Sequence, residues 1–393
     1  MKHQVVVCGA GIVGLSCVLA LSRAGVKTAL VAPRPGLPAA AGEIYHPRVY
    51  AISPASRQFL SDLGVWDMLP DTRIGRMSGI DIFGDNGGEL HLNAWQAATD
   101  QLAWIVESSE IERVLTQAVA WSGVPWIDDA VTAWSAGELR TAKGQVLLAE
   151  LCVGADGAAS PLRQLAGLAH HSTPYGDVGL VAHFDVEHPH QDTAFQWFTD
   201  EGVLALLPLP DTARGPQVSM VWSVRASRAQ DVRSLAAPAQ AARLPAMLAT
   251  VTGNRLGRLS LNSAVHGFPL YVEHADVVAP GIALVGDAAH RVHPLAGQGL
   301  NLGLGDVQTL AEIVSQRAPF RSAGDMHVLR RYRRERVEPI TAMRIVTDGL
   351  HRLFNNPVAP VSWLRNTGLN LVDAIPPLKR VLVGQASGVR RNS

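Results

Sequence analysis

Three glycine-rich segments, far apart in the sequence, carry residue types that suit a nucleotide cofactor. The first is VVVCGAGIVGLSC, in which Gly9, Gly11 and Gly14 follow a short apolar run. In this spacing the first glycine permits a tight turn, the second lets the backbone approach a pyrophosphate, and the third lets a helix pack closely on a strand. Free N–H groups at the start of that helix favour phosphates. The segment therefore predicts a dinucleotide site.

The other two segments add carboxylates to glycines. VGADGAASPLR holds Asp156 and Gly157, and GDAAHRVHPLAGQGLNLG begins with Gly286 and Asp287. Each follows an apolar run that is typical of a short strand. We expect all three segments to meet around one cofactor.

The surrounding sequence predicts how these segments are positioned. A strand over 4–8, a helix over 12–24 and a strand over 27–32 form a βαβ start. Between 176 and 270 apolar and polar residues alternate, as in antiparallel strands, and Val218, Met220, Trp222 and Val224 would share one face. A long helix is expected over about 325–355.

The predicted fold class is therefore α/β. A Rossmann-like nucleotide-binding domain is interrupted by an antiparallel β-sheet domain that would bind the substrate, and a C-terminal helical segment follows. The predicted boundaries are 1–75, 101–175 and 270–345 for the first domain, 76–100 and 176–269 for the second, and 346–393 for the tail.

Composition limits the classes of partner. The 393 residues carry zero net charge, with 47% hydrophobic and 17% charged residues, so nucleic acid is not expected. Residues 317–393, however, hold fourteen Lys or Arg and five Asp or Glu, a net charge of +9. This asymmetry predicts a basic surface near the C-terminus, although an ordinary solvated arginine-rich helix would look the same.

Cysteine and histidine usage argues against a disulfide framework and against a metal site. Cys8, Cys17 and Cys152 are odd in number and widely spaced, which predicts buried residues in a reducing compartment. His290 and His293 have ligand-like spacing but lack a third ligand, so no metal is expected. No apolar run of 18 residues occurs, and none of the sequence is predicted to span a membrane.

Several motifs together resemble a known family. HPLAGQGLNLGLGDV, PRVYAIS, LALLPLPD, MVWS and the YRRER–TDGLHRLF pair resemble group A FAD-dependent aromatic monooxygenases of the para-hydroxybenzoate hydroxylase type, and among these the ubiquinone-biosynthesis hydroxylase family. The resemblance covers essentially the whole chain. It implies that FAD is bound, that NADH or NADPH reduces it, and that O2 then forms a flavin C4a-hydroperoxide that hydroxylates an electron-rich ring.

The resemblance also implies roles for particular residues. Asp287 would bind the ribityl hydroxyls of FAD, the turn at Gly299 would bring N–H groups to the flavin ring, and His293 and Pro294 would face the flavin as the catalytic candidates. The residues expected to bind FAD are Gly9, Gly11, Gly14, Arg48, Arg113, Asp156, Gly157, Gly286, Asp287, Pro294, Gly297, Gly299, Leu300 and Asn301.

For this family the implied substrate is a prenylated phenol. Apolar walls in the sheet domain are expected from Phe195, Trp197, Leu206 and Trp222, which would equally suit the sheet's core. The basic RRYRRER helix and the apolar tail would suit an anionic membrane surface, or other ubiquinone-biosynthesis proteins that present the lipid. The expected location is cytoplasmic, at the inner face of the cytoplasmic membrane if the surface is membrane-bound.

Two alternatives stay open. One is a flavin hydroxylase of a soluble aromatic compound. The other is a non-enzymatic scaffold member of the ubiquinone-biosynthesis complex, which one departure from the dinucleotide pattern makes conceivable. That departure is Ala32, which stands where an acidic residue usually accepts hydrogen bonds from the adenosine ribose. Its loss removes about 1.5–3 kcal/mol, or one to two decades of affinity, unless Arg34 substitutes for it.

Overall fold

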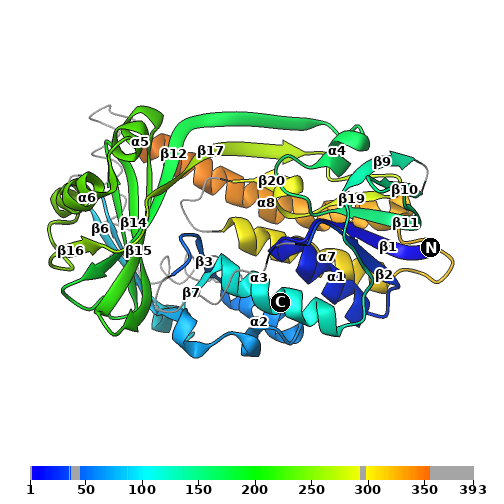
Figure 1. The fold of residues 1–393 in the computed structure, drawn as a ribbon, viewed down its shortest axis with the longest axis horizontal. Helices are drawn as coiled ribbons and strands as arrows, with labels where there is room; N and C mark the ends of the chain where they lie inside the picture. The colour runs from blue at the N-terminus through cyan, green and yellow to red at the C-terminus, as the bar shows by residue number, and fades with distance from the viewer. Residues whose placement is uncertain are drawn as a thin grey trace.

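A computed structural model describes residues 2–34, 36, 45–85, 87–135, 137–292 and 298–354. Two large sheets lie at opposite ends of the long axis, and helices run beside the sheet that contains the N-terminal strand (Figure 1). The expected fold class is confirmed by this arrangement.

The first sheet contains the predicted βαβ start. Its strands are β1 Lys2–Cys8, β2 Thr28–Val31, β8 Trp126–Ile127, β9 Val131–Ser135, β10 Glu138–Thr141, β11 Val146–Gly154, β18 Val278–Ala279 and β19 Ile282–Leu284. The order is β18-β19-β11-β1-β2-β8, and β1 pairs in parallel with both β2 and β11. Val5, Val6 and Val7 are fully buried because both faces of this central strand are covered. The parallel pairing brings the three glycine-rich segments to one edge.

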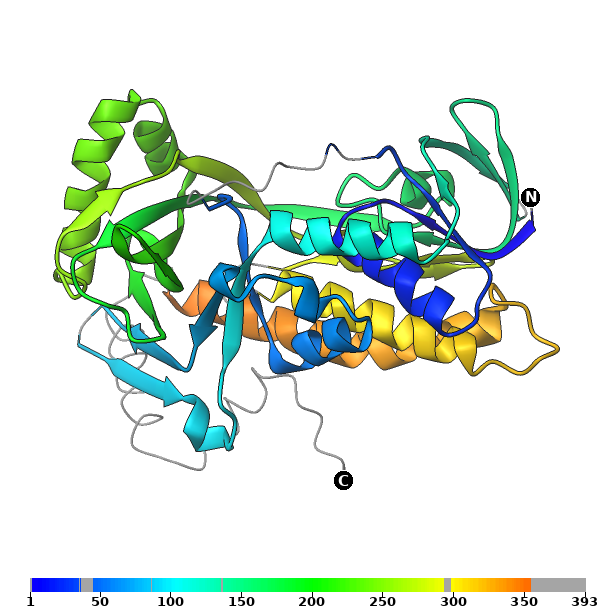
Figure 2. The ribbon, with the colours of Figure 1, turned by 60° about the horizontal axis from the view of Figure 1, so that its bottom comes forward.

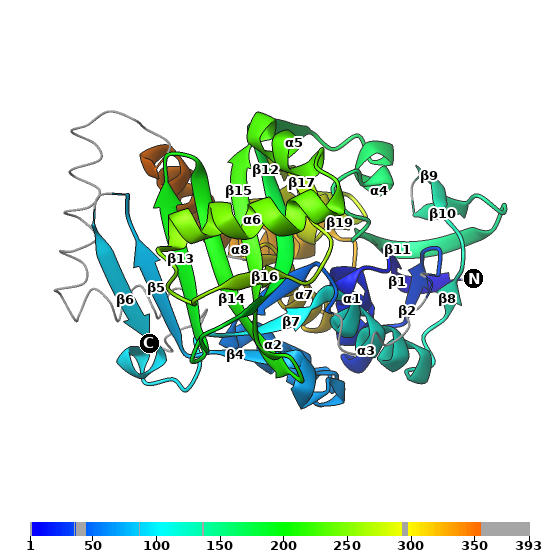
Figure 3. The same cartoon turned by 60° about the vertical axis from the view of Figure 1, so that its left-hand side comes forward.

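The second sheet is almost wholly antiparallel. Its strands are β5 Gly79–Phe83, β6 Glu89–Asn93, β12 His170–Val186, β13 Thr193–Thr199, β14 Gly202–Thr212, β15 Gly215–Arg225, β16 Leu259–Leu261, β17 His266–Ala275 and β20 His290–Arg291. The order is β20-β17-β12-β15-β14-β13-β5-β6, with β16 paired to β12. Helices α5 (Ala226–Arg233) and α6 (Ala237–Thr252) lie across its outer face (Figure 3). Its inner face is turned toward the rest of the molecule.

A small third sheet and the remaining helices fill the space between. The sheet has the order β3-β7-β4, from Val49–Ile52, Ala103–Glu107 and Ile74–Met77. The helices are α1 Ile12–Arg23, α2 Pro54–Asp62, α3 Ser108–Trp121, α4 Pro161–Leu165, α7 Gly299–Ser315 and α8 Met326–Phe354, with short 3-10 turns at Trp66–Met68, Asp71–Arg73, Ala94–Ala97 and Gly286–Ala288. Helices α7 and α8 lie side by side (Figure 2).

Long strands connect the two large bodies. The predicted boundaries at 175/176 and 269/270 fall inside β12 and β17, which pair with each other. A strand crosses each boundary, so the domain division stays a prediction. Most of the tail, 355–393, lies outside the described residues.

Two smaller predictions concern the cysteines and the membrane. All three cysteines are buried and free, as expected. Among the helices of the described chain, none is both long and apolar enough to cross a membrane.

Candidate active site

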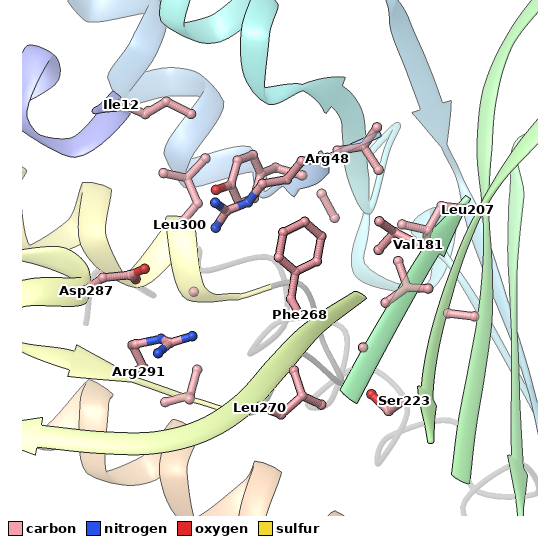
Figure 4. Close-up of a pocket in the computed structure, with 18 of the residues that line it drawn as sticks. Ile12, Arg48, Val181, Leu207, Ser223, Phe268, Leu270, Asp287, Arg291 and Leu300 are labelled. Carbon is pink, nitrogen blue, oxygen red and sulfur yellow. The ribbon is translucent and has the colours of Figure 1, made fainter. Parts of the chain in front are cut away.

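One cavity of about 550 Å³ lies between the two bodies and is lined by both of them (Figure 4). Six of the residues that the sequence predicts for the cofactor line it: Gly11, Arg48, Gly157, Asp287, Gly299 and Leu300. They come from the turn after β1, the segment before β3, the turn after β11, the turn after β19 and the start of α7. The three glycine-rich segments therefore meet, as the sequence predicts.

The first three glycines differ in what surrounds them. A Cβ at Gly9, which has φ +113°, would lie 2.3 Å from the Ala155 carbonyl oxygen, and a Cβ at Gly14 would lie 2.0 Å from the Gly9 oxygen. A Cβ at Gly11 would meet nothing within 4 Å, and Gly11 borders the cavity. Gly9 and Gly14 are thus required by backbone packing, whereas Gly11 leaves space for a ligand at the start of α1. This cradle fits a pyrophosphate.

The second segment supplies a partly unused carboxylate. Asp156 Oδ2 accepts a hydrogen bond from the Leu162 N–H at 2.9 Å, while Oδ1 is buried and has no partner among the described residues. Burial raises the pKa of Asp156, against hydrogen bonds from Ser160 and Leu162. Arg163 joins this segment to the third one, because it donates to the carbonyls of Ala158 and Ala288 at 2.6 and 2.8 Å.

Polar side chains gather at the cofactor end of the cavity. The exposed carboxylate of Asp287 makes no hydrogen bond to a described residue and lies near Arg291 in Figure 4. The Arg48 guanidinium lies 5.0 Å from the Tyr50 ring centre. Burial raises the pKa of Tyr50 to about 12 and also raises the pKa of Glu112. Asp287 is therefore free to bind hydroxyl groups, whereas the guanidinium of Arg48 already contacts Tyr50.

Arg113 and Asn301 were also expected to bind the cofactor, but neither lines the cavity. Arg113 donates from Nε and Nη2 to Glu110 Oε2 at 3.0 and 2.9 Å, so it is turned along its own helix, and Glu112 is the α3 residue that borders the cavity. The Asn301 side chain donates to the Ala51 carbonyl and accepts from the Ser53 N–H. It ties α7 to β3.

A buried ion-pair network, which the sequence alone does not predict, holds the turn that carries Asp287. Asp306 Oδ2 accepts from the Gly286 N–H at 2.9 Å and from His290 Nε2 at 2.7 Å, and Oδ1 accepts from Arg336 Nε at 2.7 Å. Burial tends to raise the pKa of Asp306, but His290 and Arg336 outweigh it and hold that pKa below its usual value. The feature of the sequence that could have indicated this network is Asp306, a single aspartate within the apolar run of α7.

Three other predicted residues, His293, Pro294 and Gly297, lie outside the described residues, and their roles stay predictions. Across the described ranges, no three His, Cys, Asp or Glu side chains gather as metal ligands would.

The residues expected to form the substrate wall do not line the cavity. Phe195, Trp197, Leu206 and Trp222 are buried in the core beneath α5 and α6, on the face of the sheet that is turned away from the cavity. One expectation is confirmed: a single face of β15 carries Val218, Met220, Trp222 and Val224. That face belongs to the hydrophobic core and not to the cavity. The wall is built by their alternating neighbours on β12–β15: Gly179, Val181, Ala194, Gln196, Val203, Ala205, Leu207, Val221 and Ser223. Phe268 of β17 is 45% exposed and lies between the two ends in Figure 4.

Ala32 lies at the end of β2, beside the edge strand β8. Its carbonyl accepts from the Trp126 indole N–H at 3.0 Å, and the side chain is buried. Arg34 places its guanidinium 4.8 Å from the centre of the Trp126 ring, and its N–H donates to Asp128. The guanidinium therefore already has an aromatic partner.

Comparisons with known proteins decide the family. The sequence profile described as FAD binding domain matches residues 2–346. The chain is 31% identical over 396 residues to 3-demethoxyubiquinol 3-hydroxylase of Escherichia coli K12, covering 98% of each protein. It is 34% identical over 413 residues to ubiquinone hydroxylase UbiL of Rhodospirillum rubrum, covering 98% of this chain and 89% of that one. This chain belongs to the FAD-dependent ubiquinone-biosynthesis hydroxylases.

A solved structure agrees in fold. p-Nitrophenol 4-monooxygenase PnpA of Pseudomonas putida superposes with a TM-score of 0.76 over 99% of each chain, at 18% identity. Through its family, this hydroxylase is an FAD-dependent aromatic monooxygenase, which uses O2. When bound, FAD supplies the redox chemistry that activates O2. Gly11 and the N-terminus of α1 would hold its pyrophosphate, Asp287 its ribityl hydroxyls, and the start of α7 its ring.

Proposed function

We propose that this hydroxylase acts on the ring of a polyprenylated phenol in ubiquinone biosynthesis, with NADH or NADPH as the reductant. The observation that carries the proposal is the continuity of the cavity. The same space borders the cofactor residues Gly11, Asp287 and Leu300 and the apolar inner face of the second sheet. A ring can therefore approach the cofactor while an apolar substituent stays in the sheet half.

The extent of the sheet wall supports a long apolar substituent. Residues of six neighbouring strands border the cavity, in the order β17-β12-β15-β14-β13-β5. Because neighbouring strands lie about 4.8 Å apart, this wall extends about 24 Å along the sheet. Its side chains are mostly small and apolar, so they leave width for a chain and exclude water around the reacting ring.

The protein's own tasks follow from this arrangement. The polar end binds the cofactor through backbone N–H groups and Asp287, and the sheet orients the ring. Phe268, a half-exposed aromatic side chain between the two ends, offers a face for the substrate ring.

The exposed face of α8 supports a further part of the proposal. Arg330, Arg333 and Arg334 are exposed, and so is Val337 at 54%. A cluster of arginines beside an exposed apolar side chain suits an anionic lipid surface. We propose that the enzyme collects its lipid-like substrate there, as a peripheral protein at the cytoplasmic face of the membrane.

The substrate proposal is tested by the rate of NAD(P)H oxidation. We expect a short-chain prenylated methoxyphenol to stimulate oxidation at lower concentration than methoxyphenol itself, and to yield a product one oxygen heavier. Equal stimulation by both would favour a hydroxylase of soluble aromatics. Stimulation by neither, with FAD bound, would favour the non-enzymatic scaffold.

A further inference from the structure

Two polar side chains interrupt the apolar wall of the cavity. Gln196 on β13 and Ser223 on β15 both border the cavity, and they are only 8% and 6% exposed. Their neighbours on the wall are Ala194, Ala205 and Val221. A buried polar group normally has a hydrogen-bond partner, so a partner is expected for both side chains.

Neither side chain hydrogen-bonds to any residue that the structure describes. The contrast with Gln217 is informative. Gln217 is 1% exposed, and its amide nitrogen donates to Asp185 Oδ1 at 2.6 Å and to Thr212 Oγ1 at 3.0 Å. The same sheet thus satisfies one buried glutamine from within the protein and leaves Gln196 directed into the cavity.

The register of the strands fixes how far apart these groups are. Gln196 pairs with Ala205, and Ser223 pairs with Val203, so β14 lies between them. Two strand spacings and two residues along the strand separate their Cα atoms by about 12 Å. The side chains of Val203 and Ala205 form a small apolar floor between the two polar groups.

We propose that Gln196 and Ser223 bind oxygen substituents of the substrate ring, with the ring lying over Val203 and Ala205. This rests on the proposed function and deepens it. The ligand class is an aromatic ring that carries a hydroxyl group and an alkoxy or second hydroxyl group. The Gln196 amide donates to one ring oxygen or accepts from a phenolic O–H, and the Ser223 hydroxyl contacts the other. Both are substrate-binding residues that select oxygenated rings over bare ones.

The test compares two probes on the FAD-loaded enzyme. One is a geranyl-substituted methoxyphenol, and the other is the same compound without its phenolic hydroxyl. Binding is followed as a change in the flavin absorption spectrum. The wild type should bind the phenol about five- to tenfold more tightly, as one neutral hydrogen bond allows. Gln196→Met, which keeps length and removes the amide, should bind both probes equally, and Ser223→Ala should weaken binding of both.

Ser219→Ala is the matched control. Ser219 lies on the same strand and the same face as Ser223, but its hydroxyl is fully buried and does not border the cavity. This variant should bind both probes as the wild type does. Gln196→Leu serves as a second variant, and FAD content and melting temperature establish that each variant folds.

Two outcomes would overturn the inference. If the Gln196 variants still prefer the phenol by the wild-type factor, Gln196 does not bind the ring oxygen, although the proposed function stands. If the wild type holds FAD but neither probe changes its spectrum or its NAD(P)H oxidation, the proposed function itself is wrong.

Discussion

Single residues decide how tightly the cofactor is held and how its turn is fixed. Ala32 removes a carboxylate at the end of β2, while the open space at Gly11 and the free carboxylate of Asp287 are retained. Family membership shows that FAD is still the cofactor. Arg34 lies over Trp126, so it already has a partner. The loss at position 32 should therefore appear as weaker affinity.

Restoring the carboxylate should tighten FAD binding. We expect Ala32→Glu to lower the dissociation constant about 10- to 100-fold, since a charge-assisted hydrogen bond contributes about 1.5–3 kcal/mol. The measurement is a titration of apoprotein that follows flavin fluorescence. Ala32→Gln, of equal size without charge, is the control, and equal affinity of the two variants would contradict the argument.

The Asp306 network predicts a large effect on stability. Asp306→Asn would leave the buried guanidinium of Arg336 without its charged partner, and the free energy of unfolding should fall by about 3–5 kcal/mol. Urea unfolding measures this. Asp325→Asn removes an i,i+4 pair with Arg321 that is partly exposed, and it should change stability much less. Similar losses in both variants would be inconsistent with a special role for the buried network.

The same network predicts that the free energy of unfolding depends on pH. The pKa of Asp306 is held below its usual value of 3.8 in the folded chain, so the unfolded chain binds the proton more readily. The stabilising contribution of Asp306 is complete above pH 3.8, the usual pKa. It is lost as the pH falls through the lower pKa that Asp306 has in the folded chain. The difference in unfolding free energy between wild type and Asp306→Asn should therefore narrow in acid. A difference that stays constant down to pH of about 2 would argue against this linkage.

At the scale of elements, alternation along the strands separates the cavity from the core. The sequence predicts these strands and the shared face of Met220 and Trp222 correctly. It does not reveal which face meets the cofactor, because both faces are buried and apolar. The large aromatic side chains lie under α5 and α6, and the small ones border the cavity.

Neighbouring residues on β14 should therefore respond differently to substitution. Ala205→Leu fills the cavity, so it should weaken binding of a prenylated phenol at least tenfold and change stability by less than about 0.5 kcal/mol. Leu206→Ala empties the core and should cost about 2–5 kcal/mol, without changing phenol binding by the folded enzyme. Thermal unfolding and phenol titration of both variants check this. The reverse pattern would mean that the faces are assigned wrongly.

Contacts between distant segments set the limit of sequence-based prediction. The glycine turn is predictable because its residue spacing belongs to one βαβ unit, although Gly9 also packs against Ala155 after β11. Arg113 is not, since one residue along a helix turns the side chain by about 100° and only the fold shows that Glu112 faces the cavity. Asp306 contacts Arg336 thirty residues later, and Gln196 and Ser223 lie on two strands that are separated by β14.

At the scale of the whole molecule, charge is unevenly distributed, and the arginines of the basic C-terminal segment have two different roles. Within RRYRRER, Arg336 is buried against Asp306 and Tyr332 is buried with its hydroxyl on the Leu284 carbonyl, whereas the other four arginines are exposed. Only part of the basic stretch is thus available for a surface.

That surface predicts salt-dependent binding to membranes. The protein should co-sediment with vesicles that contain phosphatidylglycerol at low salt, and release at high salt, because the attraction is electrostatic and screened. Replacing Arg330, Arg333 and Arg334 together by Gln should reduce the bound fraction several-fold while FAD binding is retained. Absence of co-sedimentation by the wild type at low salt would rule out the membrane surface.

Hydroxylation of a prenylated ring is tested most directly by a single turnover under ¹⁸O2. The purified protein, loaded with FAD, is mixed with NADH or NADPH and a prenylated methoxyphenol, and the product is analysed by mass spectrometry. We predict a product that carries one ¹⁸O atom on the ring, since one cavity borders both the cofactor residues and the apolar sheet wall. Consumption of NAD(P)H with hydrogen peroxide as the only oxygen product would contradict ring hydroxylation by this protein.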